Sequence, residues 1–213
     1  MDQLDALKEK WQAAEQEFPR LSYDEIYKML LKKSSSIVKW IFIISICELL
    51  FWIGMIFILP DSYKEITAGM GIDDFMVVTN ILHFLIFGVF IYLFYRNYVS
   101  IKVTDNTKNL MRSILKTRKT VRYFVFYNIG MFILSSVVLN FIYYANSEQL
   151  YEIMGSPSAR GINAENFATI FIVIQVIVGI VFVGILGLFY WLVYGILLGR
   201  LKRNYKELKV MDT

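Results

Sequence analysis

Glu48 and His83 are ionisable residues in stretches of the chain that are otherwise largely apolar. Glu48 lies at the centre of segment 37–59, which as a helix rising about 1.5 Å per residue is long enough to cross the hydrocarbon core of a bilayer. Burying an ionisable group at that depth is costly unless it has a partner, a proton or a water-filled cavity. A carboxylate beside an imidazole, which titrates near neutral pH, is a pair that can relay a proton or hold a cation.

Helix geometry predicts that these two residues meet. The second apolar segment, 75–95, follows the first after a short connection, so the two are expected to be antiparallel neighbours. His83 lies two residues from the centre of its segment, which gives a depth difference from Glu48 of about 3 Å. We therefore predict an intramembrane polar pair. It would serve either as a structural clasp between two helices or as a proton or cation relay.

The elements that must position this pair are helices. Of the 213 residues, 57% are hydrophobic, and the mean hydropathy is +0.52, which is too apolar for a soluble domain of this length. The apolar residues gather in four blocks, predicted to be transmembrane helices at 37–59, 75–95, 123–144 and 167–198. We therefore predict an all-α integral membrane protein with a four-span bundle over 37–199. The last block is long for one crossing, and the sequence leaves open whether it is one continuous helix.

The charges between the blocks predict the topology. Basic residues outnumber acidic ones by eight to one in the predicted loop 96–122, and they prevail again in the tail 200–213. The connections on the other side, 60–74 and 145–165, are acidic. Because short cytoplasmic loops carry an excess of Lys and Arg, we expect a multi-pass protein of the inner (plasma) membrane with both termini in the cytoplasm.

The basic loop is expected to lie against anionic lipid headgroups. Thr104 or Asp105 could cap a helix there, with Leu110 and Ile114 among the apolar residues of one face. A basic amphipathic segment beside a bilayer is typical of headgroup binding. No base-reading motif accompanies the charge, so nucleic acid is not an expected partner. The predicted headgroup-binding residues are Lys108, Arg112, Lys116, Arg118, Lys119 and Arg122.

The first 36 residues are predicted to form short amphipathic helices in the cytosol. An apolar stripe with helical spacing, the docking stripe, consists of Leu4, Leu7, Trp11 and Phe18. It is expected to pack on the protein's own cytosolic helices, on lipid headgroups or on a partner helix. Pro19 interrupts this helix, and Ser22 with Glu25 matches a capping box that starts the next one.

Small and aromatic residues of the last block predict helix packing. The glycines that share one sector of the helix are Gly184, Gly187, Gly195 and Gly199. Such residues let another helix approach closely, either within the bundle or in a homodimer. The aromatic clusters at 143–144 and 190–194 are interpreted as interface belts or bundle packing.

Signatures of enzymes are missing from the sequence. It has one His and one Cys, and it carries no phosphate-binding glycine loop, HExxH or GxSxG, so no metal site, cofactor or catalytic residue is predicted. The leading hypothesis is a structural or regulatory membrane module that contacts a partner through its cytosolic helices. The alternative is a small transporter or channel subunit centred on Glu48 and His83. A wet polar cavity would favour transport, and a dry, closed bundle would favour the module.

Two stretches carry a resemblance. The segment 101–123, IKVTDNTKNLMRSILKTRKTVRY, and the opening LKEKWQ at 7–12 are similar to sequences of small, uncharacterised multi-span membrane proteins of Bacteroidota. The resemblance implies the same membrane layout over the whole chain. It implies no activity.

Overall fold

The computed structural model describes residues 22–58, 60–104, 106–155 and 161–211. These residues form helices and no strands. In chain order the elements are α2 (Tyr23–Phe57), α3 (Asp61–Gly69), α4 (Asp73–Lys102), α5 (Thr107–Ala145), α6 (Ser147–Met154), α7 (Ala164–Tyr190), the π-helix η2 (Trp191–Gly195) and α8 (Ile196–Met211). The docking stripe lies outside the described residues.

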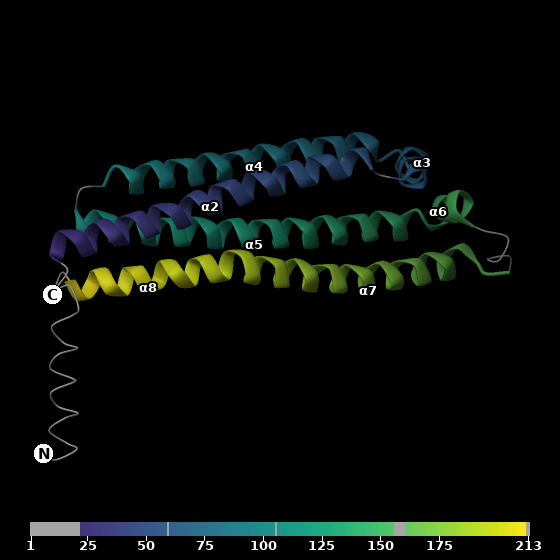
Figure 1. Ribbon diagram of the computed structural model, residues 1–213. Coiled ribbons are helices and arrows are strands. Elements are labelled where there is room, and N and C mark those ends of the chain that lie inside the picture. The colour runs from purple at the N-terminus through teal and green to yellow at the C-terminus, as the bar shows by residue number, and fades with distance from the viewer. Residues whose placement is uncertain (1–21, 59, 105, 156–160, 212–213) are drawn as a thin grey trace, which may run out of the picture.

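Four helices are long and apolar enough to cross a membrane, as the four apolar blocks predict. They are α2, α4, α5 and the continuous rod formed by α7, η2 and α8. The last apolar block is therefore one uninterrupted helix apart from its π-turn (Figure 1). Large apolar side chains cover the outside of the rods, among them Leu50, Leu85 and Ile180, which are each more than half exposed. A bilayer would solvate this surface.

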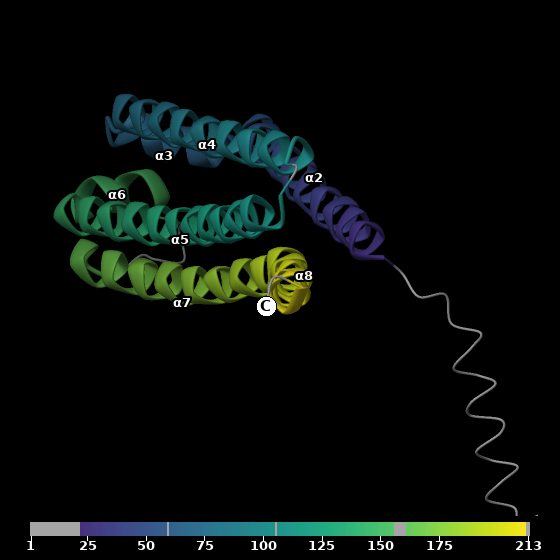
Figure 2. The ribbon, with the colours of Figure 1, turned by 90° about the vertical axis from the view of Figure 1, so that its left-hand side faces the viewer.

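The long helices lie side by side and alternate in direction (Figure 1). α2 packs against α4 and α8, and α5 packs against α4, α7 and α8. Seen from the end where α2 begins, α4, α5 and α7 are stacked in that order (Figure 2). The basic end is the end of the bundle at which α2 begins, α4 is connected to α5, and α8 ends. The opposite end carries the short helices α3 and α6, which pack on each other.

The predicted basic loop is helical over most of its length, which corrects the sequence-based boundary. α4 continues to Lys102 and α5 begins at Thr107, so only a short turn remains. Asn106 caps α5, because its side-chain oxygen accepts the backbone N–H of Lys108 at 2.9 Å. Leu110 and Ile114 are completely buried in the bundle. Their apolar face therefore packs on neighbouring helices, and the two long helices project beyond the predicted spans.

The start of α2 has the predicted capping box. The Ser22 side chain accepts the backbone N–H of Glu25 at 3.3 Å, and the Glu25 carboxylate accepts the backbone N–H of Ser22 at 2.8 Å. These two bonds satisfy N–H groups that a helix end otherwise leaves without a partner. α2 then runs on without a break into the first apolar block.

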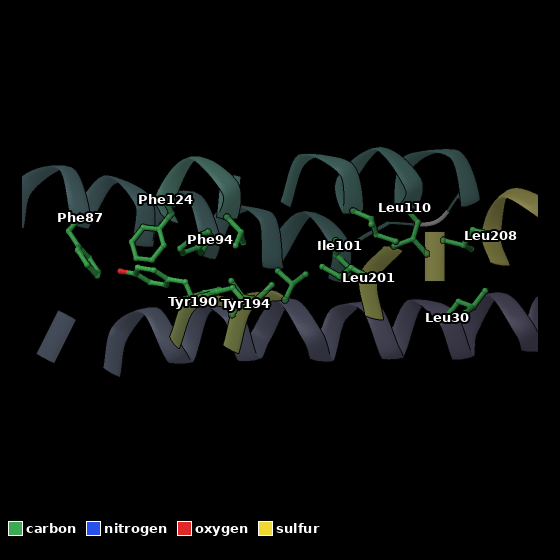
Figure 3. Close-up of a cluster of buried hydrophobic side chains, with 14 residues drawn as sticks. Leu30, Phe87, Phe94, Ile101, Leu110, Phe124, Tyr190, Tyr194, Leu201 and Leu208 are labelled. Atoms are coloured by element: carbon green, nitrogen blue, oxygen red, sulfur yellow. The ribbon is translucent and has the colours of Figure 1, made fainter. Parts of the chain in front are cut away.

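The hydrophobic core runs along the bundle axis (Figure 3). Near the middle it contains Tyr190 and Tyr194, and toward the basic end it continues through Ile101 and Leu201 to Leu110. A second, smaller core cluster joins α6 to the bundle at the other end and contains Ile72, Tyr143, Leu150 and Ala168. The bundle is therefore closed by packed apolar side chains on the basic side of its middle.

Candidate functional site

Glu48 lies at the middle of the bundle with both carboxylate oxygens hydrogen-bonded. It is 8% exposed and continues the buried face of α2 that contains Ile41 and Ser45. The Tyr190 hydroxyl donates to Glu48 Oε1 at 2.5 Å, and the Tyr194 hydroxyl donates to Oε2 at 3.1 Å. Hydrogen bonds to an ionised acceptor are short and strong. The two hydroxyls offset part of the cost of burying the carboxylate.

A π-turn presents both tyrosines to the same carboxylate. In an α-helix, residues four apart differ by about 40° around the axis, whereas a π-turn holds more residues per turn. η2 follows Tyr190 directly and includes Tyr194. Their ring centroids are 5.8 Å apart. Single π-turns within α-helices are frequently found at functional sites.

Phe124 of α5 packs around the two tyrosines. Its ring makes edge-on contacts with Tyr190 and Tyr194, at centroid distances of 6.3 and 5.8 Å. It makes further edge-on contacts with Phe87 and Phe94 of α4, at 5.0 and 5.4 Å. These rings fill the interior beside the carboxylate. They hold the phenol groups in one orientation.

On the basic side of Glu48, two pairs of buried polar side chains are hydrogen-bonded between helices. Asn204 of α8 donates to Ser34 of α2 at 3.0 Å, and Asn97 of α4 donates to Thr120 of α5 at 3.1 Å. All four side chains are at most 9% exposed. The first contact joins α8 to α2, and the second joins α4 to α5.

On the opposite side of Glu48 a pocket opens between the helices. Its volume is about 350 Å³, and its walls come from α2, α4, α5 and α7, with Tyr63 contributed by α3. The polar or hydrogen-bonding residues that line it are Tyr63, Thr79, Asn80, His83, Asn128, Ser135 and Tyr190. Tyr190 therefore connects the pocket to the buried carboxylate, because it lines the pocket and its hydroxyl donates a hydrogen bond to Glu48.

Tyr63 is the pocket residue contributed by α3. Its hydroxyl lies 3.7 Å from the Met76 sulfur. Burial, and then the nearby charge of Asp73, raises the pKa of the Tyr63 hydroxyl. The group therefore stays neutral at physiological pH and remains a hydrogen-bond donor.

His83 is not the partner of Glu48, which corrects the predicted contact. Its Nδ1 atom lies 3.3 Å from the Tyr127 hydroxyl of α5, and its ring stacks on that of Tyr127 with centroids 5.7 Å apart. The depth argument compares heights along two helices and does not give the direction in which each side chain points. Glu48 faces α7 and η2, whereas His83 faces α5. Both nevertheless belong to one site, because His83 lines the pocket that reaches Tyr190.

Sequence reasoning did not identify Tyr190 and Tyr194 as the hydrogen-bond partners of Glu48. The cluster at 190–194 was interpreted as an interface belt or as bundle packing, and both tyrosines pack inside the bundle. Their spacing of four residues within the last apolar block is a signal for one shared helix face. That signal becomes specific only when the helix opposite carries an acceptor such as Glu48.

The four glycines predicted to pack against another helix of the bundle do not do so. A Cβ atom added at Gly184, Gly187 or Gly199 would meet nothing within 4 Å. At Gly195 it would meet only Trp191, which belongs to the same helix. The glycine face points away from the other rods because the buried tyrosines turn a different face of the helix inward.

The predicted headgroup-binding residues lie along the half of α5 near the basic end. Five of the six are exposed, and Arg118 is half-buried. The Lys119 ammonium lies over the Tyr123 ring at 5.6 Å from the centroid, a favourable cation–π distance. The exposed charges are free of helix packing. Binding to anionic lipid remains a prediction.

Comparison with known proteins gives one match. The family described as "Domain of unknown function (DUF8845)" matches residues 24–213. No curated protein and no solved structure matches the chain.

Proposed function

The chain belongs to this family of unknown function, and from its geometry we propose that it is a small membrane transporter in which solute binding is linked to the protonation of Glu48. The observation that supports the proposal is the double role of Tyr190, which lines the pocket and donates to the buried carboxylate. A solute that contacts Tyr190 would alter the hydroxyl that solvates Glu48. Binding and proton affinity would then be linked through a single side chain.

Membrane insertion and orientation are part of the proposal. The four long apolar helices support a multi-pass protein, and the basic loop and tail favour a cytoplasmic location for the basic end. Both termini would then lie in the cytoplasm of a cell whose inner membrane holds the protein. The pocket would open toward the outside, while packed side chains close the cytoplasmic half. Alternating access would require a second state in which this closure moves to the other side.

The structural or regulatory module remains the second hypothesis. It depends on the docking stripe at Leu4, Leu7, Trp11 and Phe18. If that stripe docks a protein, Trp11→Asp should release the partner from the purified complex. The pocket has no role in that hypothesis, so the two proposals separate on variants of Glu48.

Dicyclohexylcarbodiimide provides the test of the proton site, because it modifies protonated carboxylic acids in apolar surroundings. We expect one modified peptide, containing Glu48, and we expect the rate of modification to fall as the pH is raised and the protonated fraction declines. Glu48→Gln should abolish the modification. Glu65→Gln, which changes an exposed acid of α3, is the matched control and should leave it unchanged. A modification rate at Glu48 that does not depend on pH would contradict the proposed proton linkage.

A further inference from the structure

We infer that the pocket takes a small organic cation, an alkylammonium that carries an apolar or aromatic group. This inference rests on the proposed solute site and specifies its chemistry. It is carried by three features of the pocket, namely the charge at its floor, the aromatic rings in its walls and an acceptor in its side.

The charge at the floor is negative. None of the residues that line the pocket in the described part of the chain is Lys, Arg, Asp or Glu. Glu48 lies behind the Tyr190 hydroxyl that bonds to it, and the charge of Asp73 lies near Tyr63, so both charged groups beside the pocket are negative. A negatively charged solute would meet no cationic partner and would be repelled by the Glu48 carboxylate. A cationic solute would neutralise the carboxylate in surroundings of low dielectric, where attraction between charges is strong.

The walls are aromatic. Rings come from α2, α3, α4, α5 and α7, and the lining residues that supply them are Trp52, Tyr63, His83, Phe84, Phe132 and Tyr190. Trp52 is further held by an edge-on contact with Phe182 of α7, at a centroid distance of 6.4 Å. Aromatic faces attract cations through the ring quadrupole, and quaternary ammonium groups are recognised by cages of such rings.

Asn128 supplies an acceptor to the side of the pocket. Its side-chain N–H donates to the backbone carbonyl of Phe124 at 2.8 Å. The side-chain oxygen is therefore left to accept a hydrogen bond from a solute N–H. Asn128 as a whole is 8% exposed, and it lines the pocket.

Two other ligand classes fit the pocket poorly. A divalent metal ion needs several oxygen or nitrogen ligands, and no group of three His, Cys, Asp or Glu side chains exists among the described residues. A sugar needs many hydrogen bonds, whereas half of the lining residues are apolar side chains. The volume of about 350 Å³ lies in the range of sites for small organic molecules.

Isothermal titration of the purified full-length protein in mild detergent tests this inference. The probe is benzyltrimethylammonium, and phenylmethanesulfonate, an anion of similar shape, is its charge-reversed control. We expect saturable binding of the cation and none of the anion. Glu48→Gln should weaken cation binding at least tenfold. Tyr143→Phe changes a buried tyrosine of the second core cluster and should leave the affinity unchanged.

Phe132→Leu is the second variant, because it removes an aromatic face of the pocket and leaves Glu48 in place. It should also weaken binding several-fold, and size-exclusion profiles will establish that each variant is folded. The inference is overturned if the anion binds as well as the cation, if the cation does not bind, or if both variants retain the wild-type affinity. Modification of Glu48 by dicyclohexylcarbodiimide on the same preparation separates the two claims. If the cation does not bind but the modification of Glu48 still depends on pH, the inference about the ligand is wrong, and the proposed proton-linked site still stands.

Discussion

Tyr190 and Tyr194 each satisfy one oxygen of the same carboxylate, so the three side chains act as a unit. Removing one hydroxyl leaves a buried oxygen of Glu48 without its donor. A buried polar atom without a partner is more destabilising than an apolar replacement of both partners. The effects of substitutions at these three residues on the free energy of unfolding should therefore be non-additive.

Tyr194→Phe should lower the free energy of unfolding in detergent by about 1 kcal/mol, as expected for an interhelical polar contact in a membrane protein. In the Glu48→Leu background the same change should have little effect, because the acceptor is already gone. Denaturant unfolding of the four proteins in this cycle gives the interaction energy directly. Equal losses in both backgrounds would mean that the two side chains do not interact.

Helix α2 is the element that carries Glu48, and its first turn depends on an ionised Glu25. The backbone N–H and side chain of Ser22 hold the pKa of Glu25 below its usual value. A lowered folded-state pKa stabilises the helix end above the unfolded pKa, and this stabilisation is lost as the pH falls through the folded value.

Amide hydrogen exchange in the first turn of α2 should therefore be more protected at pH 7 than at pH 3, after correction for intrinsic rates. The difference should disappear in Glu25→Ala. Amides near Thr120 of α5, in a segment (106–147) that contains no Asp or Glu, serve as the internal control. A pH-dependent difference that survives in Glu25→Ala would assign the effect to another group.

At the element scale, local patterns predicted the structure where local interactions decide it. The capping box at Ser22 and the four apolar blocks needed only neighbouring residues and helix length. The segment 96–122 was predicted to be a loop that contains a helix capped by Thr104 or Asp105. The helix is present, but its cap is Asn106, and α4 continues to Lys102 before it. The helix toward which the Glu48 side chain points depends on which helix packs against that face of α2. That is a property of tertiary packing, which depth along a helix cannot supply.

The whole molecule is asymmetric, with packed polar pairs near the basic end and an open pocket near α3 and α6. The same asymmetry appears in its charges. If the basic end is cytoplasmic, reporters fused at residue 110 and at the C-terminus should read cytoplasmic, and reporters near residues 68 and 156 should read external. A cytoplasmic reading at 156 would mean that α5 or the last rod does not cross the membrane.

The central claim is that water reaches the pocket beside Glu48 from the side of α3 and α6. The cysteine thiolate attacks the sulfur of a methanethiosulfonate reagent and displaces sulfinate, and the thiolate forms in water and not in lipid. Ser135 lines the pocket, whereas its neighbour Leu134 is 59% exposed on the apolar outer surface at nearly the same depth. Cys47 is exposed, so the comparison is made in a Cys47→Ser background.

The measurement is the rate at which a membrane-impermeant methanethiosulfonate reagent, added outside intact cells, modifies each new cysteine. Ser135→Cys should react, and Leu134→Cys should remain unmodified. An unreactive Ser135→Cys, or equal rates at the two positions, would contradict a water-filled pocket leading to Glu48.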